Sequence, residues 1–124
     1  MRILFAGGGT GGHLYPGLAI ARAVQQLDPD ARPFFIGARR GIERDVLPAS
    51  GFPHRLLDLH PLYRSRPWEN WRTILGFARA WREIGALARE ERPAVVVGTG
   101  GYAAAATCGW AAAHGVPVAL QEQN

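Results

Sequence analysis

The chain has 124 residues, enough for one domain with its own hydrophobic core, and its 48% hydrophobic content excludes a disordered polypeptide. The single cysteine, Cys108, excludes an internal disulfide, and no segment approaches the roughly 20 apolar residues of a membrane-spanning helix. The formal net charge is +4, and all 14 basic residues are arginine, since the chain has no lysine. This excess permits anionic partners. Because no RNA-binding aromatic motif, zinc-ligand spacing or basic heptad accompanies it, we expect no nucleic-acid partner.

Apolar runs and helical patterns alternate along the chain. In order, the sequence predicts strand 2–7, helix 16–27, strand 32–37, helix 42–51, strand 54–59, helix 68–90, strand 94–101, helix 102–115 and strand 116–121. Pro16 suits the first position of its helix, and Gly115 suits the left-handed residue that follows a helix. Because the strands are continuously apolar and alternate with helices, we predict an α/β fold with a doubly wound parallel sheet in the order 3-2-1-4-5.

Glycine-rich segments follow the first and fourth predicted strands. They read GGGTGG, from Gly7 to Gly12, and GTGGY, from Gly98 to Tyr102. In the predicted strand order the two segments are neighbours at the carboxyl edge of the sheet, where open α/β sheets bind ligands. Each segment leads into a helix whose first N–H groups attract anions. The pair predicts a cradle for a phosphate or pyrophosphate; the alternative is that the glycines only permit tight turns.

The first glycine segment also contains the spacing G-x-G-x-x-G, at Gly7, Gly9 and Gly12, which is typical of dinucleotide-binding domains. Such domains place an acidic residue after the second strand to bind a ribose, whereas this chain has Arg39 and Arg40 there. Because arginine can bind the 2′-phosphate of NADP, a small NADP-binding module is an alternative function. Against it, the predicted helix begins about four residues later than the dinucleotide pattern requires.

His13 directly follows the first glycine segment. An imidazole titrates near neutral pH, which suits a general base that removes a proton from an attacking hydroxyl group. The alternative is that His13 only hydrogen-bonds the loop backbone or positions a phosphate. Glu122 is a second candidate for the base, and its alternative role is to order the loop through a hydrogen bond.

The predicted helix 68–90 has an apolar arc that covers about half of its circumference or more. Trp68, Trp71 and Leu75 lie on this arc, and Arg72 lies on the opposite, charged side. We expect these four residues to contact a membrane interface, where tryptophan lies at headgroup depth and arginine meets anionic lipid. The alternative is that the whole arc packs on the sheet.

The segments GGGTGGHLYPGLAIA, VVVGTGGYAAA and GVPVALQEQN, in this order, resemble the N-terminal domain of the MurG family. The resemblance covers essentially the whole chain. Members of that family are UDP-N-acetylglucosamine (UDP-GlcNAc) transferases that make lipid II for peptidoglycan. The resemblance implies a GT-B glycosyltransferase of two domains that inverts the anomeric centre without a metal ion or cofactor. Residues 1–124 would be its Rossmann-like acceptor-binding domain, and the C-terminal donor-binding domain would be absent from this chain.

The resemblance also implies which residues contact the substrates. They belong to the two glycine segments and the end of the chain: Thr10, Gly11, Gly12, Gly100, Gly101, Tyr102 and Asn124. The first three and Asn124 would touch the donor, UDP-GlcNAc. The others would complete the cradle for the pyrophosphate of the acceptor, undecaprenyl-pyrophosphoryl-N-acetylmuramoyl-pentapeptide (lipid I). The chain departs from the family at Gln121, where histidine is frequent, and in the alanine-rich run after Tyr102, which replaces a Ser-Gly-Pro segment.

The resemblance predicts a peripheral enzyme at the cytoplasmic face of the bacterial inner membrane, on an anionic lipid surface. It would act in cell-wall synthesis, and hence in cell shape and division. We expect the chain to be inactive without a donor-binding domain. An alternative function is that of a non-catalytic subunit that recruits a separate catalytic chain to the membrane, as in split GlcNAc transferases.

Overall fold

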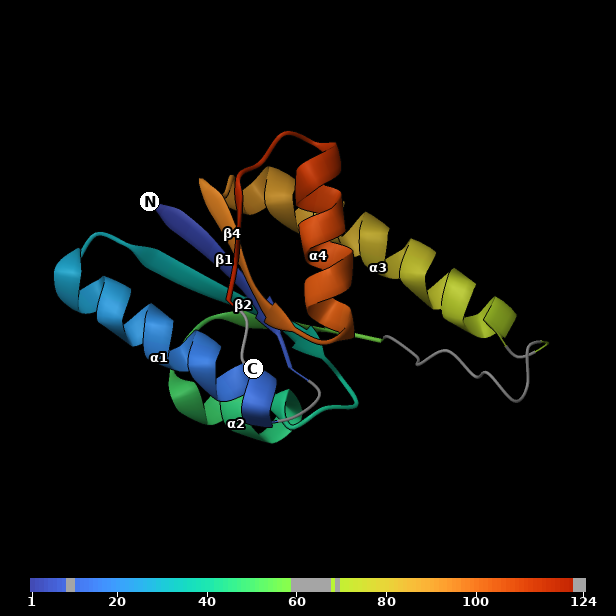
Figure 1. Cartoon of the computed structure of the whole chain (residues 1–124), viewed down its shortest axis with the longest axis horizontal. Coiled ribbons are helices and arrows are strands. Elements are labelled where there is room, and N and C mark those ends of the chain that lie inside the picture. Colours follow the sequence, from blue (N-terminus) through green and yellow to red (C-terminus); the bar gives the residue numbers. More distant parts are fainter. Residues whose placement is uncertain (9–10, 59–67, 69, 122–124) are drawn as a thin grey trace.

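Five parallel strands form one sheet in the order β3-β2-β1-β4-β5, in a computed structural model that describes residues 1–8, 11–58, 68 and 70–121 (Figure 1). The strands are β1 (Arg2–Gly7), β2 (Arg32–Ala38), β3 (His54–Leu57), β4 (Val95–Gly100) and β5 (Val118–Leu120). The helices are α1 (Gly11–Leu27), α2 (Glu43–Ser50), α3 (Asn70–Glu91) and α4 (Tyr102–Ala113). The predicted strand order is confirmed, and every predicted helix and strand is present.

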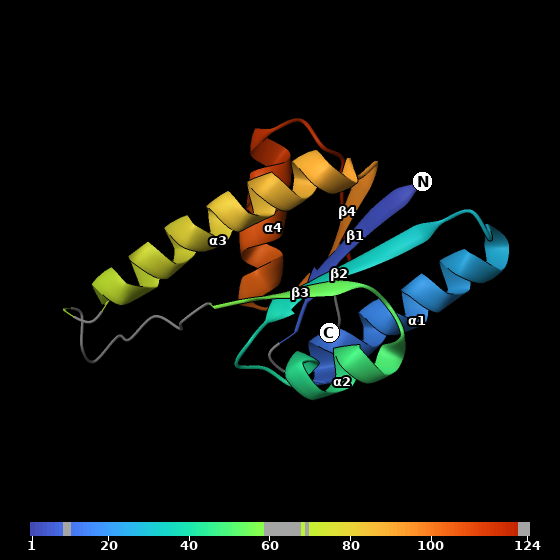
Figure 2. The ribbon, with the colours of Figure 1, turned by 180° about the vertical axis from the view of Figure 1, so that it is seen from behind.

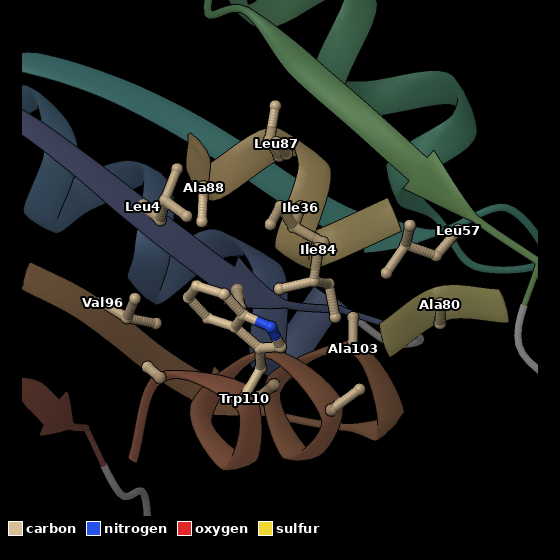
Figure 3. Packing of buried hydrophobic residues seen from close by; sticks show 14 of the residues in the cluster. Leu4, Ile36, Leu57, Ala80, Ile84, Leu87, Ala88, Val96, Ala103 and Trp110 are labelled. Atoms are coloured by element: carbon tan, nitrogen blue, oxygen red, sulfur yellow. The ribbon is translucent and has the colours of Figure 1, made fainter. Parts of the chain in front are cut away.

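Helices cover both faces of the sheet, with α1 and α2 on one side and α3 and α4 on the other (Figures 1 and 2). The period of two along a strand accounts for this arrangement. In β1, Ile3 and Phe5 pack with α1 and α2, while Leu4 and Ala6 pack with α3 and α4. Figure 3 shows Trp110 of α4 reaching toward α3 within this second cluster.

Helix α1 begins at Gly11, so the prediction of a start near Pro16 was wrong, and Pro16 lies inside the helix. Proline in that position removes one intrahelical hydrogen bond. Burial of Leu14 explains the earlier start, because this side chain is only 1% exposed and belongs to the core between α1 and the sheet. Pro48 likewise lies inside α2, which ends at Ser50 and is followed by Gly51 in a left-handed conformation with φ 82°.

Within the described residues, most buried side chains of α3 lie in its C-terminal half. Ala80, Ile84, Leu87 and Ala88 are buried in the core that α3 shares with α4. The N-terminal half projects past the carboxyl edge of the sheet in both views (Figures 1 and 2). None of the helices within the described residues has the length and apolar content to cross a membrane.

Candidate functional site

The two glycine segments meet at the carboxyl edge of the sheet. The N–H group of Gly8, which follows β1, donates a hydrogen bond of 3.2 Å to the carbonyl oxygen of Gly100 at the end of β4. Gly8 has φ +146° and Gly101 has φ +90°, values that strain any residue with a Cβ. A Cβ on Gly101 would also overlap the carbonyl oxygen of Gly8. Glycine at these two positions therefore permits the close approach of the two segments.

His13 lies between the two glycine segments, in the first turn of α1. Its Nδ1 is 3.1 Å from the carbonyl oxygen of Gly8. A carbonyl oxygen only accepts hydrogen bonds, so Nδ1 carries the proton and donates it. In the neutral ring Nε2 is then the nitrogen with a free lone pair, which is the form required of a base. The contact with Gly8 thus selects the tautomer of His13.

The His13 ring also packs against the second glycine segment. A Cβ on Gly100 would lie 2.6 Å from Cδ2 and 2.9 Å from Nε2 of the imidazole. Gly100 has φ +115°, so both its backbone conformation and its neighbour require glycine. The ring is half-buried, and its Nε2 lies on the side of the β4 segment.

Two helix N-termini flank this histidine. Helix α1 begins at Gly11 and α4 begins at Tyr102, and neither carries an acidic residue in its first turn. The residue before α4 is Gly101, which provides no side-chain cap. The first N–H groups of a helix attract anions through the partial positive charge at that end. The arrangement can therefore bind a phosphate or pyrophosphate.

The structure brings most of the predicted substrate-binding residues to this edge. Residues of the two segments found together here are Gly11, Gly12, His13, Gly100, Gly101 and Tyr102. Thr10, Glu122 and Asn124 lie outside the described residues. No group of three histidine, cysteine, aspartate or glutamate side chains suited to a metal ion occurs within the described ranges.

A cavity of about 390 Å³ lies beside the second glycine segment, between α4 and the end of β5. Cys108 and Leu120 line it together with Ala104. Burial raises the pKa of the Cys108 thiol, which favours the neutral thiol over the nucleophilic thiolate. Cys108 also packs, partly buried, against the core that α3 and α4 share.

Sequence reasoning missed one buried charged residue at this edge. Glu43, the first residue of α2, is fully buried, and its Oε1 accepts a 3.4 Å hydrogen bond from the N–H group of Ala38. Its side chain also lies against Gly8 and Gly37. In the sequence it stands in the charged run IERD, which gives no sign of burial. In the sequence, the glycines at the ends of the two preceding strands, Gly8 and Gly37, are the signal that could have indicated space for a buried side chain.

The predicted membrane-contact residues lie on α3 and just before it. An exposed apolar face, here called the α3 apolar face, consists of Trp68, Trp71, Ile74, Leu75 and Phe77. Trp68 is 70% exposed and Trp71 is 55% exposed. The alternative that the whole arc packs on the sheet is therefore wrong for this half of the helix. Arg72 lies in the same half of α3, but its side chain is outside the described part of the chain.

A second cavity, of about 480 Å³, lies beside this face. It is lined by Arg39 after β2, Asp58 after β3, and Trp71, Leu75, Arg79 and Glu83 of α3. The neighbouring Arg40 approaches Asp58, with Nε 3.7 Å from Oδ1. Both arginines that favoured an NADP site thus lie near α3. The start of α1 at Gly11 removes the objection that this helix begins too late for a dinucleotide pattern.

Residues 3–124 match the model of the glycosyltransferase family 28 N-terminal domain. The chain belongs to this family, and its class is that of a Rossmann-like N-terminal domain of a GT-B glycosyltransferase. The predicted fold class is confirmed.

The similarity extends to one particular kind of transferase. The chain is 43% identical over 128 residues to the UDP-N-acetylglucosamine–N-acetylmuramyl-(pentapeptide) pyrophosphoryl-undecaprenol N-acetylglucosamine transferase of Moorella thermoacetica, covering 100% of this chain and 33% of the relative. It is 40% identical over 124 residues to the same-named protein of Limosilactobacillus fermentum, covering 100% of this chain and 34% of the relative. The crystal structure of Acinetobacter baumannii MurG matches with a TM-score of 0.74 at 25% identity, covering 99% of this chain and 35% of MurG.

These matches confirm the resemblance to the MurG family that the sequence motifs indicate. The chain spans about a third of the length of the curated relatives that it matches. The comparisons therefore establish the family of this chain. That it takes part in the reaction of its relatives is a proposal.

Proposed function

We propose that this chain is the acceptor-binding and membrane-facing domain of an enzyme that transfers GlcNAc from UDP-GlcNAc to lipid I, forming lipid II. The observation that carries the proposal is the position of His13 between two glycine segments and two helix N-termini. Lipid I and UDP-GlcNAc both contain a pyrophosphate, the kind of anion that such N-termini bind. The names of the relatives supply the sugar and the lipid-linked acceptor.

His13 acts as the base through Nε2. As the 4-hydroxyl oxygen of the muramoyl sugar bonds to the anomeric carbon of GlcNAc, its proton passes to Nε2. The bond from that carbon to UDP breaks on the opposite face, and its electron pair leaves with the β-phosphate oxygen. The anomeric centre is therefore inverted. The imidazolium that forms keeps its Nδ1–H bond to the carbonyl oxygen of Gly8, which stabilises the positive charge.

The substrates share parts of the site. The N-termini of α1 and α4, with Gly100, Gly101 and Tyr102, bind the pyrophosphate of lipid I. Thr10, Gly11, Gly12 and Asn124 also contact UDP-GlcNAc, most of which is bound by a separate donor-binding domain. No metal ion or cofactor takes part in this proposed reaction.

The α3 apolar face binds the membrane. The free energy falls when exposed tryptophan and leucine side chains enter the membrane interface, and the net positive charge of the chain favours anionic lipid. We infer a peripheral location at the cytoplasmic face of the bacterial inner membrane, where the lipid-linked acceptor is embedded.

The test of this proposal uses the chain joined to the remaining two thirds of the Moorella thermoacetica relative. We expect the joined polypeptide to transfer radiolabelled GlcNAc from UDP-GlcNAc to a soluble lipid I analogue. The 124-residue chain alone should transfer none. Absence of transfer by the joined polypeptide, when the intact Moorella enzyme is active in the same assay, would contradict the proposal.

A further inference from the structure

Glu43 is a carboxylic acid placed in the interior at the carboxyl edge of the sheet, with 0% of its surface exposed. A buried acid is costly unless its oxygens find hydrogen-bond donors. The Ala38 N–H group supplies one donor to Oε1 at 3.4 Å. Glu43 is also the first residue of α2, where the N-terminal end of the helix favours a negative charge. The local structure thus holds the carboxyl group in a defined place.

Two glycines make room for this side chain. A Cβ on Gly37, near the end of β2, would lie 2.6 Å from Cγ of Glu43. A Cβ on Gly8, directly after β1, would overlap Oε1. The Glu43 side chain therefore packs directly against the backbone of the first glycine segment.

Gly8 connects Glu43 to His13. Its N–H group bonds to Gly100, and its carbonyl oxygen accepts the Nδ1–H of His13 at 3.1 Å. One residue's backbone thus joins the two glycine segments and selects the tautomer of the histidine. A shift of Gly8 would change the position of His13 and weaken the bond that keeps the proton on Nδ1.

We infer that Glu43 is a positioning residue for His13 and acts through Gly8. Its carboxylate supports the Gly8 backbone from the side of β2, so that the carbonyl oxygen meets Nδ1 and leaves Nε2 as the base. The inference rests on the proposed catalytic role of His13. It assigns Glu43 no direct contact with either substrate.

Two substitutions and a matched control test this inference in the joined polypeptide described above. Glu43→Ala removes the support. Glu43→Gln keeps the shape of the side chain but removes the negative charge that the N-terminal end of α2 favours and replaces one acceptor oxygen with an N–H donor group. Leu47→Ala is the control, because Leu47 is also fully buried in α2 and belongs to the core rather than to the glycine segments.

Two quantities are measured on each folded variant. The ¹⁵N chemical shifts of the His13 imidazole report which nitrogen is protonated, and initial rates give kcat and KM for both substrates. We expect both Glu43 variants to lose part of the Nδ1–H form and to lose kcat on the order of tenfold or more, with smaller changes in KM. Leu47→Ala should lower the thermal midpoint and keep the tautomer and kcat of the parent.

A folded Glu43→Ala protein with the parent's tautomer and kcat would overturn the inference. So would a Leu47→Ala protein that loses the Nδ1–H form and kcat to the same extent. If Glu43→Ala does not fold, Glu43→Gln decides, and parental values in that variant overturn the inference. If the parent polypeptide transfers no GlcNAc, the proposed function fails, while the tautomer measurement still tests the link from Glu43 to His13.

Discussion

The proposed role of His13 as the base depends on two ring nitrogens with different tasks. Nδ1 donates to the carbonyl oxygen of Gly8, and Nε2 is left to take a proton. His13→Asn separates these tasks, because the asparagine side chain retains an N–H donor near Gly8 and has no group that can act as the base. We expect kcat of the joined polypeptide to fall by about 10²- to 10⁴-fold with little change in KM.

His114→Asn is the control for this substitution. His114 lies at the other end of α4, where its Nδ1 bonds to the carbonyl oxygen of Trp110 at 2.8 Å. Its replacement should leave kcat unchanged. A His13→Asn protein that keeps the parent's kcat would show that His13 only binds or positions the loop.

Gly100 allows the His13 ring to occupy its place, and an added methyl group tests this contact. Gly100→Ala meets two penalties: the backbone has φ +115°, and the new Cβ would lie 2.6 Å from the imidazole. Gly115→Ala meets only the first, since Gly115 has φ +74° and a Cβ there would find open space, with nothing within 4 Å beyond its chain neighbours. Because both substitutions strain the backbone, we expect each to lower the free energy of unfolding by roughly 1–3 kcal/mol, as measured by urea denaturation.

The two alanine variants should differ in activity more than in stability. Only Gly100→Ala displaces His13, so only this variant should lose transferase activity when it is introduced into the joined polypeptide and assayed in the folded state. Equal activity losses in the two variants would indicate that backbone strain, rather than the contact with His13, requires glycine at position 100.

At the scale of the elements, α3 has two halves with different surroundings. The C-terminal half is buried against α4, and the N-terminal half carries the α3 apolar face. The double substitution Trp71→Glu and Leu75→Glu should therefore weaken binding to phosphatidylglycerol vesicles by at least about tenfold, because it removes apolar burial and adds negative charge. Vesicle co-sedimentation measures the effect.

Leu27→Glu is the matched control for the vesicle experiment. Leu27 is an exposed apolar residue at the end of α1, far along the chain from the α3 apolar face. It should leave vesicle binding unchanged, and both proteins should keep the thermal midpoint of the parent, since the substituted side chains are exposed. Equal vesicle binding by the double variant and the parent would contradict the proposed membrane contact.

The elements that the sequence predicts well are those set by local pattern. Apolar strands that alternate with helical periods led to the correct strand order, and the glycine segments were correctly expected to meet. The start of α1 depended instead on the burial of Leu14, which favours helix through a stretch of two glycines and ahead of Pro16. Tertiary packing overrides local preference at such a boundary.

The sequence does not reveal the burial, exposure or tautomer of some residues, because these properties depend on contacts between distant segments. Glu43 is buried because Gly8 and Gly37, at the ends of two separate strands, leave space for it. The apolar arc of α3 is evident from its period, but which half is exposed depends on where α4 crosses it. The tautomer of His13 likewise follows from a bond to Gly8 that only the folded chain forms.

At the scale of the whole molecule, the site and the α3 apolar face lie at the same end. The glycine segments occupy the carboxyl edge of the sheet, and the exposed half of α3 projects past that edge (Figures 1 and 2). The proposed acceptor, which has a lipid tail and a pyrophosphate, requires this combination, because one molecule must reach both the membrane surface and the anion site.

This arrangement predicts which ligands the 124-residue chain binds by itself. A soluble lipid I analogue should shift the backbone amide signals of Gly12, His13, Gly101 and Tyr102, since the first N–H groups of α1 and α4 meet its pyrophosphate. An analogue without the pyrophosphate should shift them much less. Titration followed by ¹H–¹⁵N NMR measures both.

NADPH is the decisive comparison in the same titration. A dinucleotide would contact the first glycine segment and extend toward Arg39 and Arg40 after β2, whereas the lipid I analogue should affect the segment after β4 and leave those arginines unchanged. Saturable shifts with NADPH and none with the lipid I analogue would contradict the proposed acceptor site. Shifts with the analogue at both helix N-termini, dependent on its pyrophosphate, would support an acceptor site that this domain forms without a donor-binding partner.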